Sequence, residues 1–290
     1  MVLGPGATTA TGAGATTAAG LSDYTITVKD SGPADFVAED ERDAVRLARL
    51  CVRRLNRPYT RPGIGEPPKY EPDDLLGIGP AYPREILARV LDGSEFDEFR
   101  PRYGSTLVTG WGELHGYPVG VLAGRCGNAG QGSDAGDGGK AAQFIRHANA
   151  TGTPLLFLEN PVGGAGNPMG SAGNPMGSAG NPVGGAGNPM GGAGNPVGGA
   201  GNPVGGAIEP ALVEAVATSA VPHLTVNLGT GSGMCGRAYQ PRFLFAWPYP
   251  GALDLSGRLY DDGVLDPRDT RTALGIALAA VHSGQIGVTR

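Results

Sequence analysis

A run of seven-residue repeats between Asn160 and Gly206 is the feature that most limits how this chain can fold. Each repeat reads Asn-Pro-(Val or Met)-Gly-(Gly or Ser)-Ala-Gly. This is not a coiled-coil heptad, because it has no pair of large apolar residues. Asn-Pro-x-Gly favours a type I turn, and one Val or Met per repeat buries too little surface to offset the ordering of the glycines. We expect a mobile loop or disordered insertion; a stacked repeat and a binding segment are the alternatives.

The remaining chain is long enough to form a globular core. The 290 residues include 52 Gly and 25 Pro, and their concentration in the repeats leaves about two hundred residues that can fold. The net charge of −5, with no basic block, argues against nucleic-acid binding. No apolar run reaches transmembrane length, and the N-terminus lacks a signal-peptide pattern. We expect a soluble, intracellular protein with no nucleic-acid or membrane partner.

Apolar periodicity predicts helices alternating with strands. The predicted helices lie at about residues 44–55, 83–91, 140–149, 210–219 and 270–281, and the predicted strands at 24–28, 105–111, 117–122, 154–158 and 223–228. Residues 105–111 and 117–122 predict a β-hairpin joined by residues 112–116. Ser94 is predicted to cap a short helical turn over residues 94–99. The order of these elements is typical of an α/β fold in which helices cross between strands.

The stretch from Val221 to Pro250 holds the strongest candidate for a binding site. A predicted strand from His223 to Leu228 is followed by a turn with glycines at Gly229, Gly231 and Gly233. A strand followed by a glycine-rich turn can form a cradle of backbone N–H groups for an anion, because glycine allows close approach of the backbone. A tight strand-to-helix turn that binds no ligand is the alternative.

Other reactive side chains give weaker signals. The three cysteines, Cys51, Cys126 and Cys235, are far apart, so neither a zinc site nor a disulfide framework is predicted. A helix start after the turn would lower the pKa of Cys235, but no histidine is evident as its partner, so we do not predict a nucleophile. His115 and His147 are interpreted as surface or packing residues. On the other face of the first predicted helix lie five arginines, Arg42, Arg46, Arg49, Arg53 and Arg54. They form a solvated face or, alternatively, contact a phosphate. The aromatic stripe Phe243, Phe245 and Trp247 is interpreted as core.

Several short blocks, in order, resemble the carboxyltransferase β subunit of biotin-dependent acyl-CoA carboxylases, and most closely the methylcrotonoyl-CoA and geranyl-CoA carboxylase branch. They cover about half to two thirds of the chain. The blocks are Ser31–Asp35, Pro83–Ile86, Asp92–Phe99, Tyr103–Gly110, His115–Gly120, Pro154–Leu158, Gly233–Tyr239, Pro241–Leu244 and Leu259–Pro267.

This resemblance implies a crotonase-like α/β fold and a division of the chain. Family members have two crotonase-like lobes, of which the first binds acyl-CoA and the second carboxybiotin. By this match, residues 1–56 are a remnant of the first lobe and residues 57–82 a linker. Residues 83–159 and 207–290 form the second lobe, which the Gly/Pro-rich repeats at residues 160–206 interrupt.

The resemblance also implies a reaction, in which a carboxyl group moves from carboxybiotin to an acyl-CoA such as 3-methylcrotonoyl-CoA. Backbone N–H groups would stabilise the developing oxyanions. The implied catalytic residues are Gly229, Gly231, Ser232 and Gly233, and those near carboxybiotin are Gly233, Met234, Cys235 and Gly236. The implied partners are acyl-CoA, a biotin carboxylase or biotin carrier subunit that bears the biotin, and further copies of this chain. No metal is implied, and the expected location is the cytoplasm, or the mitochondrial matrix in a eukaryote.

Three segments depart from the family pattern. The turn before Met234 is shorter, the repeats replace the segment after Leu158, and Pro250 passes almost directly to Arg258. The alternative function is therefore a catalytically inactive crotonase-like fragment with a structural or assembly role. A third hypothesis makes the repeats themselves the functional segment, as an elastic or interaction region.

Overall fold

The computed structural model describes residues 2–3, 36–38, 40–55, 65–124, 136–160, 210–229 and 234–286. The predicted strand at residues 24–28 and nearly all of the repeats lie outside these ranges. Seven strands form one sheet, and their order in space is their order in the sequence, β3 to β9. They are β3 (Asp97–Glu98), β4 (Leu107–Leu114), β5 (Tyr117–Gly124), β6 (Leu155–Glu159), β7 (His223–Asn227), β8 (Phe243–Ala246) and β9 (Gly263–Val264).

The predicted hairpin is confirmed, with longer strands and a shorter turn. β4 and β5 pair antiparallel from Leu107 opposite Gly124 to Leu114 opposite Tyr117. Only His115 and Gly116 remain in the turn, and both have positive φ, 51° and 76°. Two consecutive residues with positive φ form the type I′ turn that suits the twist of a hairpin.

The other half of the sheet is parallel, from β5 to β9. Helix α4 (Asp137–Thr151) leads from β5 to β6, α5 (Pro210–Ala217) leads into β7, and α6 (Ala252–Gly257) lies between β8 and β9. The connection from β7 to β8 differs, since its only helical turn in the described residues is η3 (Arg237–Tyr239). The α/β prediction is therefore confirmed, with one crossover that has no α-helix among its described residues.

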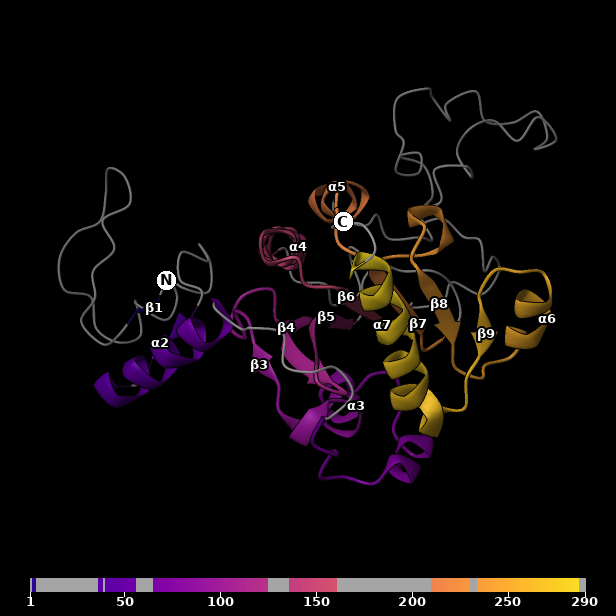
Figure 1. The fold of residues 1–290 in the computed structure, drawn as a ribbon, viewed down its shortest axis with the longest axis horizontal. Coiled ribbons are helices and arrows are strands. Elements are labelled where there is room, and N and C mark those ends of the chain that lie inside the picture. The colour runs from indigo at the N-terminus through magenta and orange to yellow at the C-terminus, as the bar shows by residue number, and fades with distance from the viewer. Residues whose placement is uncertain are drawn as a thin grey trace.

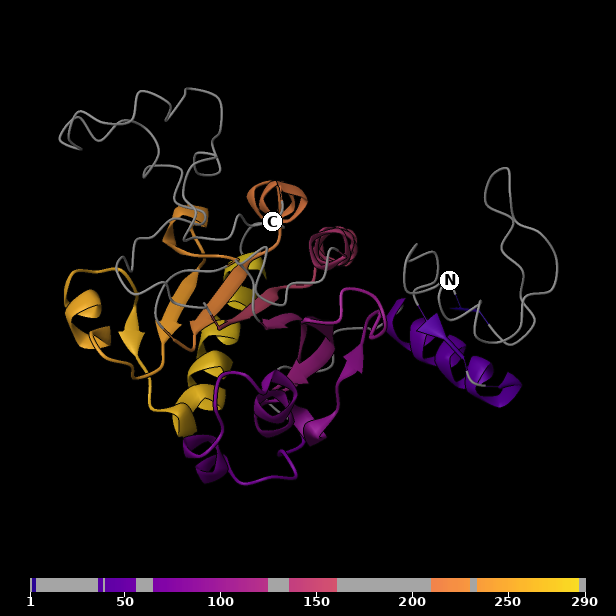
Figure 2. The ribbon, with the colours of Figure 1, turned by 180° about the vertical axis from the view of Figure 1, so that it is seen from behind.

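Helices cover both faces of the sheet (Figures 1 and 2). α4 and α5 lie on one face, and α3 (Pro83–Val90) and α7 (Thr270–Ile286) lie on the other. Side chains alternate between the faces along each strand: Leu156 and Leu158 point towards α3 and α7, and Leu155 and Phe157 point towards α4 and α5. Two apolar cores result, one on each side of the sheet.

The predicted aromatic stripe belongs to the core on the α3/α7 side. Trp247 is 5% exposed, and its Nε1–H donates to Thr270 Oγ1 at 2.8 Å, which joins the end of β8 to the start of α7. Phe243 and Phe245 are partly buried and pack against the same core.

Helix α2 (Glu41–Leu55) confirms the first predicted helix and packs next to the short strand β1 (Val2–Leu3). β1 pairs in parallel with β2 (Phe36–Val37). Asp40 caps the helix by accepting the backbone N–H of Asp43 at 2.7 Å. Arg42, Arg46 and Arg49 are exposed, which agrees with the solvated-face interpretation, and the side chains of Arg53 and Arg54 lie outside the described ones.

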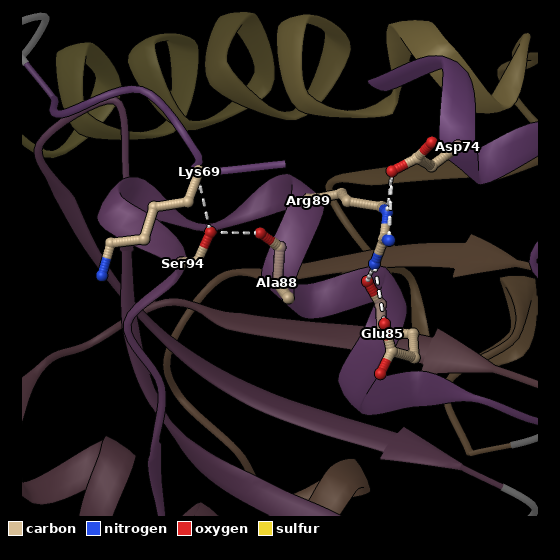
Figure 3. A network of polar contacts seen from close by, with 6 residues as sticks. All are labelled: Lys69, Asp74, Glu85, Ala88, Arg89 and Ser94. Atoms are coloured by element: carbon tan, nitrogen blue, oxygen red, sulfur yellow. Dashed lines mark hydrogen bonds and ion pairs between the residues drawn. The ribbon is translucent and has the colours of Figure 1, made fainter. Parts of the chain in front are cut away.

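A polar network ties the carboxyl-terminal part of α3 to neighbouring segments (Figure 3). Arg89, whose side chain is 11% exposed, pairs with Glu85 in the same helix and with Asp74 in η1 (Pro72–Leu76), at 2.8 and 3.1 Å. Ser94 does not cap a helical turn, so that prediction is wrong. Its hydroxyl donates to the carbonyl of Ala88 and accepts the backbone N–H of Lys69 at 2.9 Å, and the chain continues into β3.

An inner ion pair docks α7 on the hairpin. Arg271 lies 2.7 Å from Asp92, and their side chains are only 15% and 7% exposed. Asp92 also accepts the backbone N–H groups of His115 and Gly116 at 2.9 and 2.7 Å, and Arg271 donates to the carbonyl of Val90 at 2.6 Å. One carboxylate thus joins the hairpin turn, the end of α3 and the start of α7.

Of the helices described, none is both long and apolar enough to cross a membrane.

Candidate functional site

The candidate site lies beyond the carboxyl ends of the parallel strands, where ligands of open α/β sheets commonly bind. β6 ends at Glu159 and β7 at Asn227, and these residues are paired in the sheet register. The segment between β7 and β8, residues 228–242, carries the predicted glycine turn. We call this segment the glycine-rich crossover; its described residues are 228, 229 and 234–242.

The glycine-rich crossover folds back over the α4/α5 face of the sheet. Met234 and Cys235 are 1% and 0% exposed and pack in the core with Phe144, Phe157 and Leu212. Further along, Arg242 donates its N–H to the carbonyl of His223 at 2.8 Å, which brings the chain to the start of β8. The crossover therefore lies on the face that α4 and α5 cover in the two preceding connections.

Three strand side chains anchor Cys235. Its backbone N–H donates to Glu159 Oε1, and its carbonyl accepts the hydroxyl of Thr225 at 2.8 Å. Its Sγ lies 3.5 Å from Nδ1 of His223. His223, Thr225 and Asn227 alternate along β7, so all three side chains emerge on the same face of the sheet.

The other end of the turn is also tied down, since the N–H of Gly229 donates to Asn227 Oδ1 at 3.2 Å. The amides of Gly229 and Cys235 therefore bind side chains of this chain. Gly231, Ser232 and Gly233 lie outside the described residues, and their role in a cradle stays a prediction. Met234, Cys235 and Gly236 are buried, so the Met and Cys side chains serve as core.

The structure corrects the expectation for the chemistry of Cys235. The first described helical turn after the cysteine begins only at Arg237. Burial and the nearby Glu159 carboxylate raise the pKa of the Cys235 thiol, and burial lowers the pKa of His223 to about 4. A thiol beside a neutral imidazole is not an activated nucleophile. A histidine partner does exist, but it is His223 on β7, and its burial keeps the pair uncharged at neutral pH.

Sequence reasoning missed Glu159, which is 2% exposed. The available signal was a carboxylate that directly follows the apolar run Leu155–Leu158, at the carboxyl end of a buried strand. A carboxylate in that position must be hydrogen-bonded when buried.

A second buried polar cluster holds the start of α4. Lys140 is 0% exposed, and its Nζ donates to the carbonyls of Gly104 and Leu107 at 3.2 and 2.7 Å. Asp137 accepts the hydroxyl of Thr106 and the N–H of Leu107. These contacts fasten α4 to the beginning of β4.

No group of three or more His, Cys, Asp or Glu side chains among the described residues could hold a metal ion.

The family model of the carboxyl transferase domain matches residues 1–168, more than half of the chain. This chain belongs to the carboxyl transferase domain family. Its relatives include a probable biotin-dependent acyl-coenzyme A carboxylase beta2 subunit from Mycobacterium tuberculosis, which is 37% identical over 88% of this chain and 54% of its own length. A methylcrotonoyl-CoA carboxylase beta chain from Dictyostelium discoideum is 28% identical over 87% of this chain and 48% of its own length.

Solved structures of related proteins also resemble this carboxyl transferase domain protein. The beta subunit of P. aeruginosa geranyl-CoA carboxylase matches with a TM-score of 0.51 and 26% identity, over 89% of this chain and 54% of that one. The transcarboxylase 12S subunit matches with a TM-score of 0.61 at 19% identity, over 90% and 55%, and shows the fold alone. The fold is the crotonase-like α/β fold of this family. The chain spans about half the length of the curated relatives it matches.

Proposed function

We propose that this chain is the carboxyltransferase component of an acyl-CoA carboxylase, which moves a carboxyl group from carboxybiotin to an acyl-CoA of the 3-methylcrotonoyl type. The observation that carries the proposal is the 37% identity to an acyl-coenzyme A carboxylase beta subunit over 88% of this chain. Biotin would reside on a partner subunit with a biotin carboxylase or carrier function, and the chain would assemble with further copies of itself.

The anchored ends of the crossover limit which backbone N–H groups can form the proposed anion cradle. Glu159 and Asn227 already hold the amides of Cys235 and Gly229, so the amides proposed to face the substrate are those of Gly231, Ser232 and Gly233. Bound carboxybiotin supplies the carboxyl group that is transferred. The chain's contribution is a crossover tied to rigid strands on both sides of the cradle, because preorganised N–H groups stabilise developing charge without reorganising.

We propose the same lobe assignment as the sequence resemblance implies. Residues 1–56 would come from the acyl-CoA lobe and residues 57–82 from a linker, and the sheet and its helices would form the carboxybiotin lobe. Within the proposed linker, Leu75 is 2% exposed and the carbonyl of Glu66 accepts the N–H of Gly93 at 3.1 Å. The described part of this linker is thus packed on the lobe that follows it. The proposed location is the cytoplasm, or the mitochondrial matrix in a eukaryote.

A second candidate function is a non-catalytic relative with an assembly role. The specific observation in its favour is that both described amides at the ends of the turn hydrogen-bond within the chain. This candidate predicts complex formation without turnover.

Transfer of labelled carboxyl groups tests the two candidates. The purified chain, with and without an added intact acyl-CoA lobe, is incubated with carboxylated biotin carrier and 3-methylcrotonoyl-CoA. Label in the acyl-CoA supports the transferase, and its absence in both mixtures overturns it in favour of the assembly role.

A matched pair of glycine variants tests the cradle within the same assay. Gly231→Ala keeps the backbone N–H but adds a Cβ, which would prevent the close approach of the backbone that the cradle needs. Because removing an oxyanion donor outright costs about 10²–10³ in rate, we expect a displaced donor to reduce transfer at least tenfold. Gly257→Ala is the control, because a Cβ at Gly257 meets no atom within 4 Å. Equal transfer by both variants would remove Gly231 from the proposed site.

A further inference from the structure

Glu159 is buried, and burial of a carboxylate costs free energy unless the group is hydrogen-bonded. Its position therefore indicates a specific structural role. It is 2% exposed and follows four buried apolar residues of β6. An ionised group at such a position needs hydrogen bonds from its surroundings. One such hydrogen bond comes from the backbone N–H of Cys235 in the glycine-rich crossover, 76 residues further along the chain.

The backbone of Glu159 is held from both sides. Its carbonyl accepts the N–H of Leu228 at 2.7 Å, and the next residue, Asn160, donates to the carbonyl of Gly124 at 3.2 Å. The carboxylate is therefore presented from a residue fixed between β5 and β7. A fixed acceptor can impose a conformation on the segment that donates to it.

We propose that Glu159 is the positioning residue of the glycine-rich crossover. By holding the amide of Cys235, it fixes the outgoing end of the turn, while Asn227 fixes the incoming end at Gly229. Thr225 assists by donating its hydroxyl to the carbonyl of the same cysteine. The catalytic consequence of this role rests on the proposed transferase function; the structural consequence does not.

Reactivity of the Cys235 thiol measures the positioning directly. In a Cys51→Ser, Cys126→Ser background, Cys235 is the sole thiol; it is 0% exposed and its pKa is raised. A thiol reagent at neutral pH should therefore label the native protein slowly. We expect Glu159→Leu to label at least tenfold faster, because the amide of Cys235 loses its acceptor and the crossover opens.

Glu159→Gln separates the hydrogen bond from the charge. Glutamine keeps an acceptor oxygen but removes the negative charge that helps to raise the pKa of the thiol. We expect its labelling rate to stay within threefold of the parent. If the leucine variant labels no faster than the glutamine variant, the positioning role is wrong and only the charge matters.

A pair of threonine variants keeps the test decisive if Glu159→Leu fails to fold. Thr225→Val removes the hydroxyl that donates to Cys235, and Thr109→Val removes an equally buried hydroxyl that donates to the carbonyl of Phe99 at 3.1 Å. Faster labelling of Cys235 in Thr225→Val alone supports the anchored crossover. Equal labelling in both variants, at matched distance from the unfolding midpoint, contradicts it.

Turnover then separates the two proposals. If the parent transfers carboxyl groups, Glu159→Leu should raise KM for the biotin substrate and lower kcat, with little change in KM for acyl-CoA. An unchanged KM for biotin would show that Glu159 does not position the site. If the parent shows no transfer, the transferase proposal fails, and the labelling comparison still decides the role of Glu159.

Discussion

At the scale of single residues, buried polar groups of this protein link segments that are distant in sequence through hydrogen bonds and ion pairs. Glu159 joins β6 to the glycine-rich crossover, Asp92 joins the hairpin turn to α7, and Lys140 joins α4 to β4. The sequence predicted none of these connections, because an isolated carboxylate or ammonium group does not reveal its partner. It did predict which stretches are apolar enough to surround them.

Asp92→Ala should destabilise the fold by about 3–5 kcal/mol. The variant leaves Arg271 buried without its partner and two turn amides without an acceptor. Unfolding in urea measures the change. The control is Asp254→Ala, whose partner Arg258 is four residues away and whose side chain is 65% exposed; its loss should be at most about 0.5 kcal/mol. A similar loss of unfolding free energy in both variants would show that Asp92 does not link the hairpin turn to α7.

At the scale of elements, the sequence predicted the longer helices and strands well but missed the short elements β3, β8, β9 and α6 and predicted the connections poorly. Periodicity located the β4–β5 hairpin, α3, α4, α5 and α7 to within a few residues. It did not predict the two-residue turn at His115 and Gly116, because the acceptor for both turn amides is Asp92, outside the hairpin. The crossover after β7 was interpreted as a local turn, since its anchors on β6 and β7 exist only once the sheet has formed.

Two glycines of α7 should respond in opposite directions to the same substitution. A Cβ at Gly275 would lie 2.4 Å from Cδ2 of His115, whereas a Cβ at Gly284 meets nothing within 4 Å. Gly275→Ala should lower the free energy of unfolding by about 1–3 kcal/mol through overpacking. Gly284→Ala should raise it by up to about 1 kcal/mol through helix propensity.

Thermal unfolding followed by circular dichroism at 222 nm compares these two glycine variants. If Gly275→Ala is as stable as Gly284→Ala, α7 does not pack closely on the turn of the hairpin.

At the scale of the whole molecule, acid should destabilise the fold through its buried histidines. Burial lowers the pKa of His223 to about 4, and it also lowers the pKa of His115 and His282. The unfolded chain, with a histidine pKa near 6.5, binds more protons than the native state, so stability falls as the pH drops from about 6.5 towards 4. His223 alone should account for about 2 kcal/mol between pH 7 and pH 5.

Urea unfolding at pH 7 and pH 5 checks this, with His223→Gln as the comparison. The glutamine variant should lose about 2 kcal/mol less than the parent over this range. An identical loss in both proteins would place the acid sensitivity elsewhere.

The repeats set a second prediction at this scale. Replacing residues 161–206 with a six-residue Gly-Ser linker should leave the sheet intact, because β6 ends before the repeats and α5 begins after them. The shorter connection should raise the free energy of unfolding by about 1–2 kcal/mol through loop-closure entropy.

Urea unfolding and the carboxyl-transfer assay measure the effect of this deletion. A loss of stability would mean that the repeats make contacts that the fold needs. A loss of transfer with unchanged stability would support the hypothesis that the repeats are a functional segment.

The order of the strands has a consequence for how the protein is made. Because β3 to β9 lie side by side in the order in which they are synthesised, each strand leaving the ribosome finds its partner already present. Helix α7 is the exception: Leu274, Ala277 and Leu278 must return to the core that contains Leu114 and Val119 of the hairpin. Until that late helix arrives, the part of this apolar sheet face that α3 does not cover stays exposed, and this is the stage at which a chaperone would have most to protect.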